Sequence, residues 1–230
     1  MAKIAVVDFP GSNSSAEVVR ILKNLDQDAF LLNYRAESAK EAAAIIIPGG
    51  FSFGDYLRPG ALVKGTPVTG LVKRYANDGK PVLGIGNGFQ ILCEIGILPG
   101  VLLQNPSMKF CNEEANVRVE SHGSPFTKYI PEDTMMRLPM ACYYGSFYTD
   151  KRTIKDLEDA KRVALRYYDQ YGEVDLYNGF LSSLHSLAGV TNKEGNVLGL
   201  MPRIDLATDS LLGLTDGLMF FKSLINYLNE

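Results

Sequence analysis

The sequence contains 230 residues, about one and a half times the length of a usual domain. Hydrophobic residues make up 46% of it and charged residues 21%, which excludes the disordered, collagen-like and disulfide-scaffold classes of protein. The 23 basic and 26 acidic residues give a net charge of -3, so the chain lacks the basic excess of a dedicated nucleic-acid-binding domain.

Residues that commonly bind metals are scarce. The three cysteines, Cys93, Cys111 and Cys142, contain no CxxC pair, which argues against both a disulfide framework and a zinc site. The only two histidines are His122 and His185, too few for most catalytic metal centres. No phosphate-binding run of the Walker A type occurs, so we expect neither ATP binding nor any other cofactor.

The sequence also lacks the features of targeting and membrane segments. Its N-terminal apolar run is too short for a signal peptide. No stretch approaches the roughly 18 apolar residues of a membrane span. We therefore expect a cytoplasmic protein with neither a membrane nor a nucleic acid as partner.

Short apolar runs alternate with helical patterns in the first half of the chain. Strands are predicted over residues 3–8, 28–34, 44–47 and 81–85. Helices are predicted after Ser14 or Ser15, over residues 37–43, on the face formed by Val68, Leu71, Val72 and Tyr75, and over residues 88–96. Such alternation with continuously apolar strands is typical of a parallel sheet covered on both faces.

The second half favours an antiparallel extension of that sheet. Strands are predicted over residues 115–120, 162–168, 187–191 and 197–201, and the charge-rich residues 150–161 form an exposed helix or loop. A last helix is predicted near Asp216, burying Leu218, Phe221, Leu224, Ile225 and Leu228. Without repeats or a linker, we expect one α/β domain spanning residues 1–230.

The most informative stretch is PVLGIGNGFQ, residues 81–90. A buried strand there runs into a tight turn and directly into a helix, which is the geometry of a nucleophile elbow. The helix dipole and the free N–H groups would lower a nucleophile's pKa and stabilise an oxyanion. At the centre of the turn stands Gly86, which has no side chain to act as nucleophile.

Four motifs occur in order along the chain: FPGSN (9–13), PGGFSFGDYLR (48–58), GIGNGFQIL (84–92) and GNVLGLMP (195–202). Together they resemble subunit I of phosphoribosylformylglycinamidine synthase, the glutaminase subunit of a purine-biosynthesis enzyme among the class I, or triad, glutamine amidotransferases. The resemblance covers essentially the whole chain. It implies a flavodoxin-like three-layer sandwich and a large synthetase subunit as partner.

In that family a cysteine at the elbow attacks the glutamine amide, a histidine and a glutamate complete the triad, and the released ammonia passes to the synthetase. The matching positions here are Gly86, Arg203 and Asp205. A further family run, Ala-His-Gly-Glu-Gly, corresponds to ACYYG at residues 141–145. Arginine stays protonated and cannot serve as the base. Because loss of triad members costs roughly 10⁴–10⁶ in rate, the resemblance implies a degenerate, inactive member.

Part of the expected site is formed by backbone N–H groups, which do not depend on the side chains of the triad. Backbone donors of Gly49, Gly50, Phe51 and Asn87, with Gln90 beside them, could retain an oxyanion-type pocket for glutamine, another carboxylate or ammonia. The glycines of residues 84–88 do not form a dinucleotide loop, because a phenylalanine occupies the position of the third glycine.

Among the thiols, Cys142 is the candidate substitute nucleophile, because it replaces a family histidine, and His185 is its candidate partner. Cys93 and Cys111 are expected to be structural.

Three functions remain open from the sequence. The first is a non-catalytic subunit that docks on a synthetase, with free ammonia as the nitrogen source. The second is an active glutaminase with a rebuilt site that uses Cys142 and His185. The third is a module whose emptied pocket now binds a metabolite. The first and third both keep the fold and lose the triad, so the sequence does not separate them.

Overall fold

The computed structural model describes residues 1–176 and 179–230. Its strands are β1 (Lys3–Asp8), β2 (Asp28–Asn33), β3 (Ala44–Ile47), β4 (Val82–Ile85), β5 (Val101–Leu103), β6 (Cys111–Val119), β7 (Met135–Cys142), β8 (Ser146–Tyr148), β9 (Val163–Tyr168), β10 (Leu187–Thr191) and β11 (Val197–Leu200). Its helices are α1 (Ser15–Asn24), α2 (Pro67–Asn77), α3 (Asn87–Glu94), α4 (Lys151–Asp159) and α5 (Leu218–Leu228). None of the helices in these two ranges is long and apolar enough to cross a membrane.

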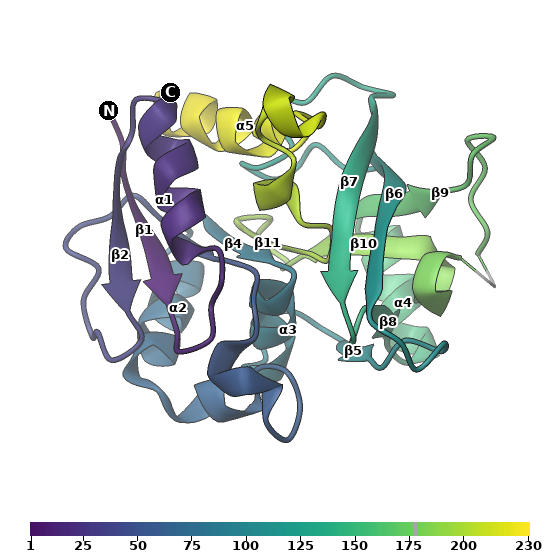
Figure 1. Cartoon of the computed structure of the whole chain (residues 1–230), viewed down its shortest axis with the longest axis horizontal. Helices are drawn as coiled ribbons and strands as arrows, with labels where there is room; N and C mark the ends of the chain where they lie inside the picture. Colours follow the sequence, from purple (N-terminus) through teal and green to yellow (C-terminus); the bar gives the residue numbers. More distant parts are fainter. Residues whose placement is uncertain (177–178) are drawn as a thin grey trace.

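A large mixed sheet runs across the molecule in the order β2-β1-β3-β4-β11-β10-β9-β6-β7 (Figure 1). The strands β2, β1, β3 and β4 pair in parallel, as the continuously apolar runs predict. The sequence analysis placed residues 197–201 in the antiparallel extension, which is wrong on one side: β11 pairs in parallel with β4 and antiparallel with β10. β1 lies between β2 and β3. The connection from β1 to β2 through α1 therefore runs toward one edge of the sheet, and the connection from β3 to β4 through α2 runs toward the other. Right-handed crossovers therefore place α1 and α2 on opposite faces of the sheet. Figure 1 shows α1 in front of the strands and α2 behind them.

The predicted antiparallel extension is confirmed by β10, β9, β6 and β7. The sequence analysis missed β7, whose run MMRLPMAC contains Pro139, and proline usually argues against a strand. β7 lies at the edge of the sheet, where a missing N–H donor is tolerated. The short pair β5 and β8 was also missed and forms a separate two-stranded sheet.

Two local predictions are wrong. Residues 37–43 do not form a helix, because Lys40 and Glu41 adopt positive φ angles of 50° and 63° in an irregular connection. Asp216 does not cap the last helix. Its carboxylate accepts a hydrogen bond from the backbone N–H of Arg137 at 2.8 Å, and Gly217 occupies the cap position of α5.

The expected burial of α5 is confirmed only in part. Phe221 and Leu224 are buried, together with Phe220, whereas Leu218 and Leu228 stay partly exposed, as does Ile225. The charge-rich residues 150–161, for which the sequence left a helix or a loop open, contain the helix α4. Asp150 caps α4 by accepting hydrogen bonds from the N–H groups of residues 152 and 153.

Helix α3 packs tightly against the carboxyl end of β3, and Gly88 makes this possible. A Cβ atom on Gly88 would lie 2.8 Å from the carbonyl carbon of Ile47 and nearer still to its oxygen. Because those atoms belong to the backbone, they cannot rotate away as a side chain would. The position of α3, and with it the turn that precedes it, depends on this contact.

Gly88→Ala should lower the free energy of unfolding by about 3 kcal/mol, because α3 must shift away from β3. Urea denaturation measures the change. Gly65→Ala is the matched control, since a Cβ on Gly65 meets no atom within 4 Å and its φ is ordinary. Equal stability of the two variants would contradict the packing argument.

Candidate functional site

The loops that follow β1, β3, β4 and β11 meet at the carboxyl edge of the sheet. Ser12 pairs with Gly50 as an isolated bridge, and the N–H of Phe53 donates to the carbonyl of Pro10 at 2.6 Å. The N–H of Gly86 donates to the carbonyl of Leu200 at 2.8 Å. This edge lies where the chain connections diverge from β1, which is the usual position of a ligand site in an open α/β sheet.

Gly86 forms the elbow predicted from the sequence. It sits between β4 and α3, at the N-cap of the helix, with φ 54° and ψ -106°. Such a backbone conformation costs residues other than glycine roughly 1–3 kcal/mol. Glycine therefore keeps the turn and relieves its strain.

A buried ion pair occupies the space above the elbow. Arg203 and Asp205 are only 3% and 1% exposed, and Nη2 of the arginine lies 2.7 Å from Oδ2 of the aspartate. Nη2 also donates to the hydroxyl of Ser14 at 3.1 Å. A Cβ on Gly86 would lie 3.0 Å from Cδ of Arg203, and one on Gly49 would lie 2.5 Å from its Cζ. The arginine therefore fills the space beside both glycines.

Asn87 links the second loop to the start of α3. Its Oδ1 accepts the N–H of Ser52 at 3.1 Å, and its Nδ2 donates to Asp55 at 3.2 Å and to Gln90 at 2.8 Å. Gln90 in turn donates to the carbonyl of Tyr144 at 2.7 Å. A cavity of about 360 Å³ adjoins Gln90 and Tyr144. The network holds the walls of this cavity in place.

Of the predicted pocket residues, Gly49, Gly50, Asn87 and Gln90 lie together at this edge. Phe51 lies at the rim, 37% exposed, with its ring 6.2 Å from that of Phe110.

The sequence analysis did not single out Ser14 or Asp55 as site residues. Burial raises the pKa of Asp55 from its ordinary 3.8 to about 6, and the hydrogen bond from Asn87 opposes the rise only partly. The only early signal for Asp55 was its place in the 48–58 motif.

The candidate substitute nucleophile lies on an edge strand. Cys142 on β7 is 4% exposed and stands directly opposite Cys111 on β6. Burial raises the pKa of Cys142 to about 12, and it also raises the pKa of Cys93. Nδ1 of His185 lies 2.8 Å from Glu158. In the described part of the chain, no hydrogen bond or ion pair joins His185 to Cys142.

Comparison with known proteins identifies the family. Residues 1–212 match the CobB/CobQ-like glutamine amidotransferase domain. Over 229 residues the chain is 40% identical to the phosphoribosylformylglycinamidine synthase subunit PurQ of Methanosarcina barkeri, covering 99% of each. It belongs to the PurQ family. The Aquifex aeolicus PurQ is 40% identical over 97% of this chain and 99% of its own length.

Solved structures confirm the class I glutamine amidotransferase fold expected of a PurQ protein. A chain from the structure of PurLQS from Thermotoga maritima superposes with a TM-score of 0.87 and 36% identity, covering 99% of this chain and 100% of that one. The glutaminase domain of Trypanosoma brucei CTPS shares the fold at a TM-score of 0.62 and 12% identity, covering 98% and 94%.

Asp205→Ala should destabilise the protein by about 3–5 kcal/mol, because it leaves the buried guanidinium without its counter-charge. Chemical denaturation provides the measurement. Asp159→Ala is the control, since it removes one partner of an exposed i,i+4 pair with Lys155 and should leave the unfolding midpoint nearly unchanged. A small effect at Asp205 would show that Arg203 is not held by this pair.

Asp55 should make the protein less stable as pH rises from about 4 through 6, since the folded state binds its proton more tightly than the unfolded state does. Asp55→Asn keeps an acceptor for Asn87 and removes the charge. At pH 7.5 it should stabilise the fold by about 1 kcal/mol, allowing for the partial exposure of the carboxylate. Urea midpoints at pH 4.5 and 7.5 measure both effects. An unchanged pH profile in the variant would contradict the assignment.

Proposed function

We propose that this chain is a PurQ-type subunit without glutaminase activity that docks on a synthetase subunit and leaves free ammonia as the nitrogen source. One observation carries the proposal: Arg203 lies over Gly86, where the family resemblance places a histidine beside a cysteine. Supporting the partner, its relatives are named subunits of phosphoribosylformylglycinamidine synthase, and a similar solved chain comes from PurLQS.

The chemistry of glutamine hydrolysis needs two groups that these positions do not supply. Attack on the amide requires a nucleophile. A base must take the proton of that nucleophile and deliver it to the departing ammonia. Glycine offers no nucleophile, and a guanidinium paired with Asp205 stays protonated and cannot accept a proton. The backbone of the elbow persists without the reacting atoms.

A rebuilt glutaminase using Cys142 and His185 is less well supported. A thiol with a pKa of about 12 is almost wholly protonated at neutral pH, and the thiolate is the reactive form. The imidazole of His185 is already engaged by Glu158, which also binds Arg166 at 3.0 Å. These contacts supply no base to activate the thiol.

Exposed apolar side chains near the elbow support docking. Tyr56, Leu57 and Met108 are 70%, 74% and 66% exposed, and they belong to the loops that also carry Phe51 and Phe110. Apolar side chains gathered on a surface typically mark a protein interface. A partner seated there would cover the cavity beside Gln90.

The wild-type chain should release no ammonia from glutamine and should resist labelling by a glutamine-site alkylator, with or without its synthetase. Gly86→Cys alone should also stay inactive, because Arg203 crowds the new side chain and its guanidinium cannot act as a base. The triple variant G86C/R203H/D205E should gain labelling at the introduced thiol. Ammonia release by the wild type at a rate within about tenfold of an intact triad would sink the proposal, since triad loss costs roughly 10⁴–10⁶.

Docking is tested by co-purification of the tagged chain with the synthetase subunit of its own organism. The double variant L57D/M108D should weaken the association by at least tenfold, since both side chains lie on exposed loops and an interface would bury them. Leu211→Asp is the control, because Leu211 is 92% exposed on the loop near α1 and α5. Failure of the wild type to associate would argue instead for the metabolite-binding module.

A further inference from the structure

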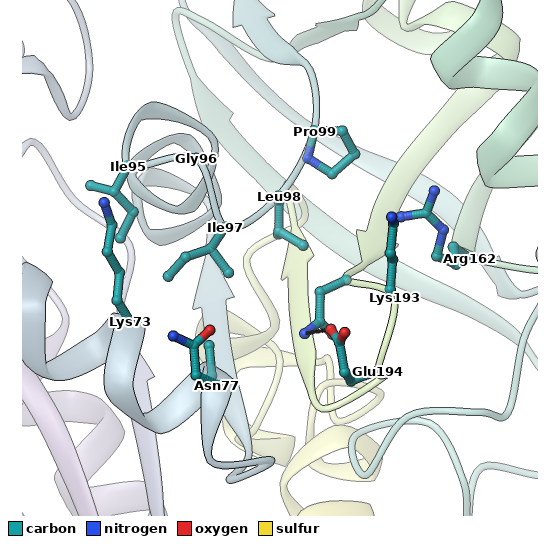
Figure 2. Close-up of a pocket in the computed structure, with 12 residues that line it drawn as sticks. Lys73, Asn77, Ile95, Gly96, Ile97, Leu98, Pro99, Arg162, Lys193 and Glu194 are labelled. Atoms are coloured by element: carbon teal, nitrogen blue, oxygen red, sulfur yellow. Dashed lines mark hydrogen bonds between the residues drawn. The ribbon is translucent and has the colours of Figure 1, made fainter.

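A second cavity lies at the opposite end of the sheet from the elbow. It measures about 820 Å³ and is bordered by the ends of α2 and α3 and by the turn between β10 and β11 (Figure 2). The N–H of Val82, the first residue of β4, donates to the carbonyl of Asn196 in this turn. Gly86 follows the other end of β4, four residues and about 13 Å away. The cavity is thus separate from the site described above.

Three cationic side chains line this cavity without partners. Lys73 comes from α2, Arg162 immediately precedes β9, and Lys193 belongs to the turn. Over the described ranges, none of the three forms an ion pair or a side-chain hydrogen bond. The one carboxylate among the lining residues, Glu194, accepts a hydrogen bond from Asn192 at 2.9 Å. Among the residues that line this cavity, three cations therefore stand against one carboxylate. Arg162 and Lys193 also border an adjoining hollow with Asp156 and Asp159, but neither forms an ion pair with them within the described residues.

Arg162 differs from the two lysines because part of its charged group is buried. Its Nε atom is buried and has no hydrogen-bond acceptor. A buried donor on a charged group is costly to leave unsatisfied, and such atoms usually indicate a missing acceptor. In Figure 2 the side chains of Arg162 and Lys193 stand on one wall of the cavity, and Lys73 stands on the other. An anion against the first wall would accept from Arg162 and Lys193, and Lys73 would face it from the other side.

The floor of the cavity is apolar. Ile97, Leu98 and Pro99 form this floor between the two walls (Figure 2). The carbonyl of Leu92 accepts the N–H groups of both Ile97 and Leu98, at 3.0 and 3.2 Å. The carbonyl of Leu92 is therefore engaged within the chain and is not an acceptor for the three cations.

We infer that this cavity binds a phosphorylated small molecule of nucleotide size. The phosphate would accept from Arg162 and Lys193, with Lys73 facing it, and the base or sugar would pack on Ile97 and Pro99. The volume lies within the range of about 300–1,000 Å³ typical of small-molecule sites. The inference does not depend on the fate of the elbow or on synthetase docking.

Isothermal titration calorimetry of the full chain tests the inference with ADP and inorganic pyrophosphate as probes. ADP should bind saturably at one site and at least tenfold more tightly than pyrophosphate, because only ADP uses the apolar floor. K73M/K193M should weaken ADP binding at least tenfold, and Arg162→Gln should do the same. Ile97→Ser should weaken ADP but leave pyrophosphate unchanged.

The matched control is K151M/K222M, which removes the same charge from two exposed positions outside the cavity. It should bind ADP as the wild type does. Equal weakening in the two double variants would reduce the effect to a general ionic attraction and overturn the inference. Absence of saturable ADP binding, or equal affinity for pyrophosphate and ADP, would overturn it as well.

Discussion

The buried pair between Arg203 and Asp205 governs the carboxyl edge of this protein. Two charges removed from water are tolerated only when each satisfies the other, so neither side chain can leave or change alone without a large cost. That constraint holds the guanidinium against Gly49 and Gly86. The space beside these two glycines is therefore occupied by a pair that is expensive to disrupt.

The scaffold around the elbow is held by contacts that do not involve Gly86, Arg203 or Asp205. Asn87 binds Ser52, Asp55 and Gln90, and so ties the loop after β3 to the first turn of α3. Gly88 lets the same helix approach β3. These contacts stabilise the fold whether or not the elbow carries a cysteine. The loops around the site therefore depend on Asn87 and Gly88 for their positions.

The two ends of the parallel sheet differ in how their charges are balanced. At the carboxyl edge the arginine is matched by a carboxylate at 2.7 Å. At the amino end Lys73, Arg162 and Lys193 have no such partner in the described residues, although the whole chain is slightly acidic. The net charge is a sum over the whole chain, so it does not reveal a local excess of positive charge. The arrangement of the strands brings these three cations to the same end of the sheet.

The sequence by itself determined the parallel core, the elbow at Gly86 and the family, because apolar periodicity and contiguous motifs are local properties of the chain. It missed β7, because the tolerance for Pro139 depends on that strand lying at the edge of the sheet. It singled out Arg203 and Asp205 by their place beside the last motif, but only the tertiary structure paired them and set them over the elbow. The roles of Asp55 and Asp216 were likewise decided by distant partners, Asn87 and the backbone of β7. Contacts between residues far apart in the chain leave no periodic signal in the sequence, and burial, which sets the pKa of Asp55, arises only when those contacts form.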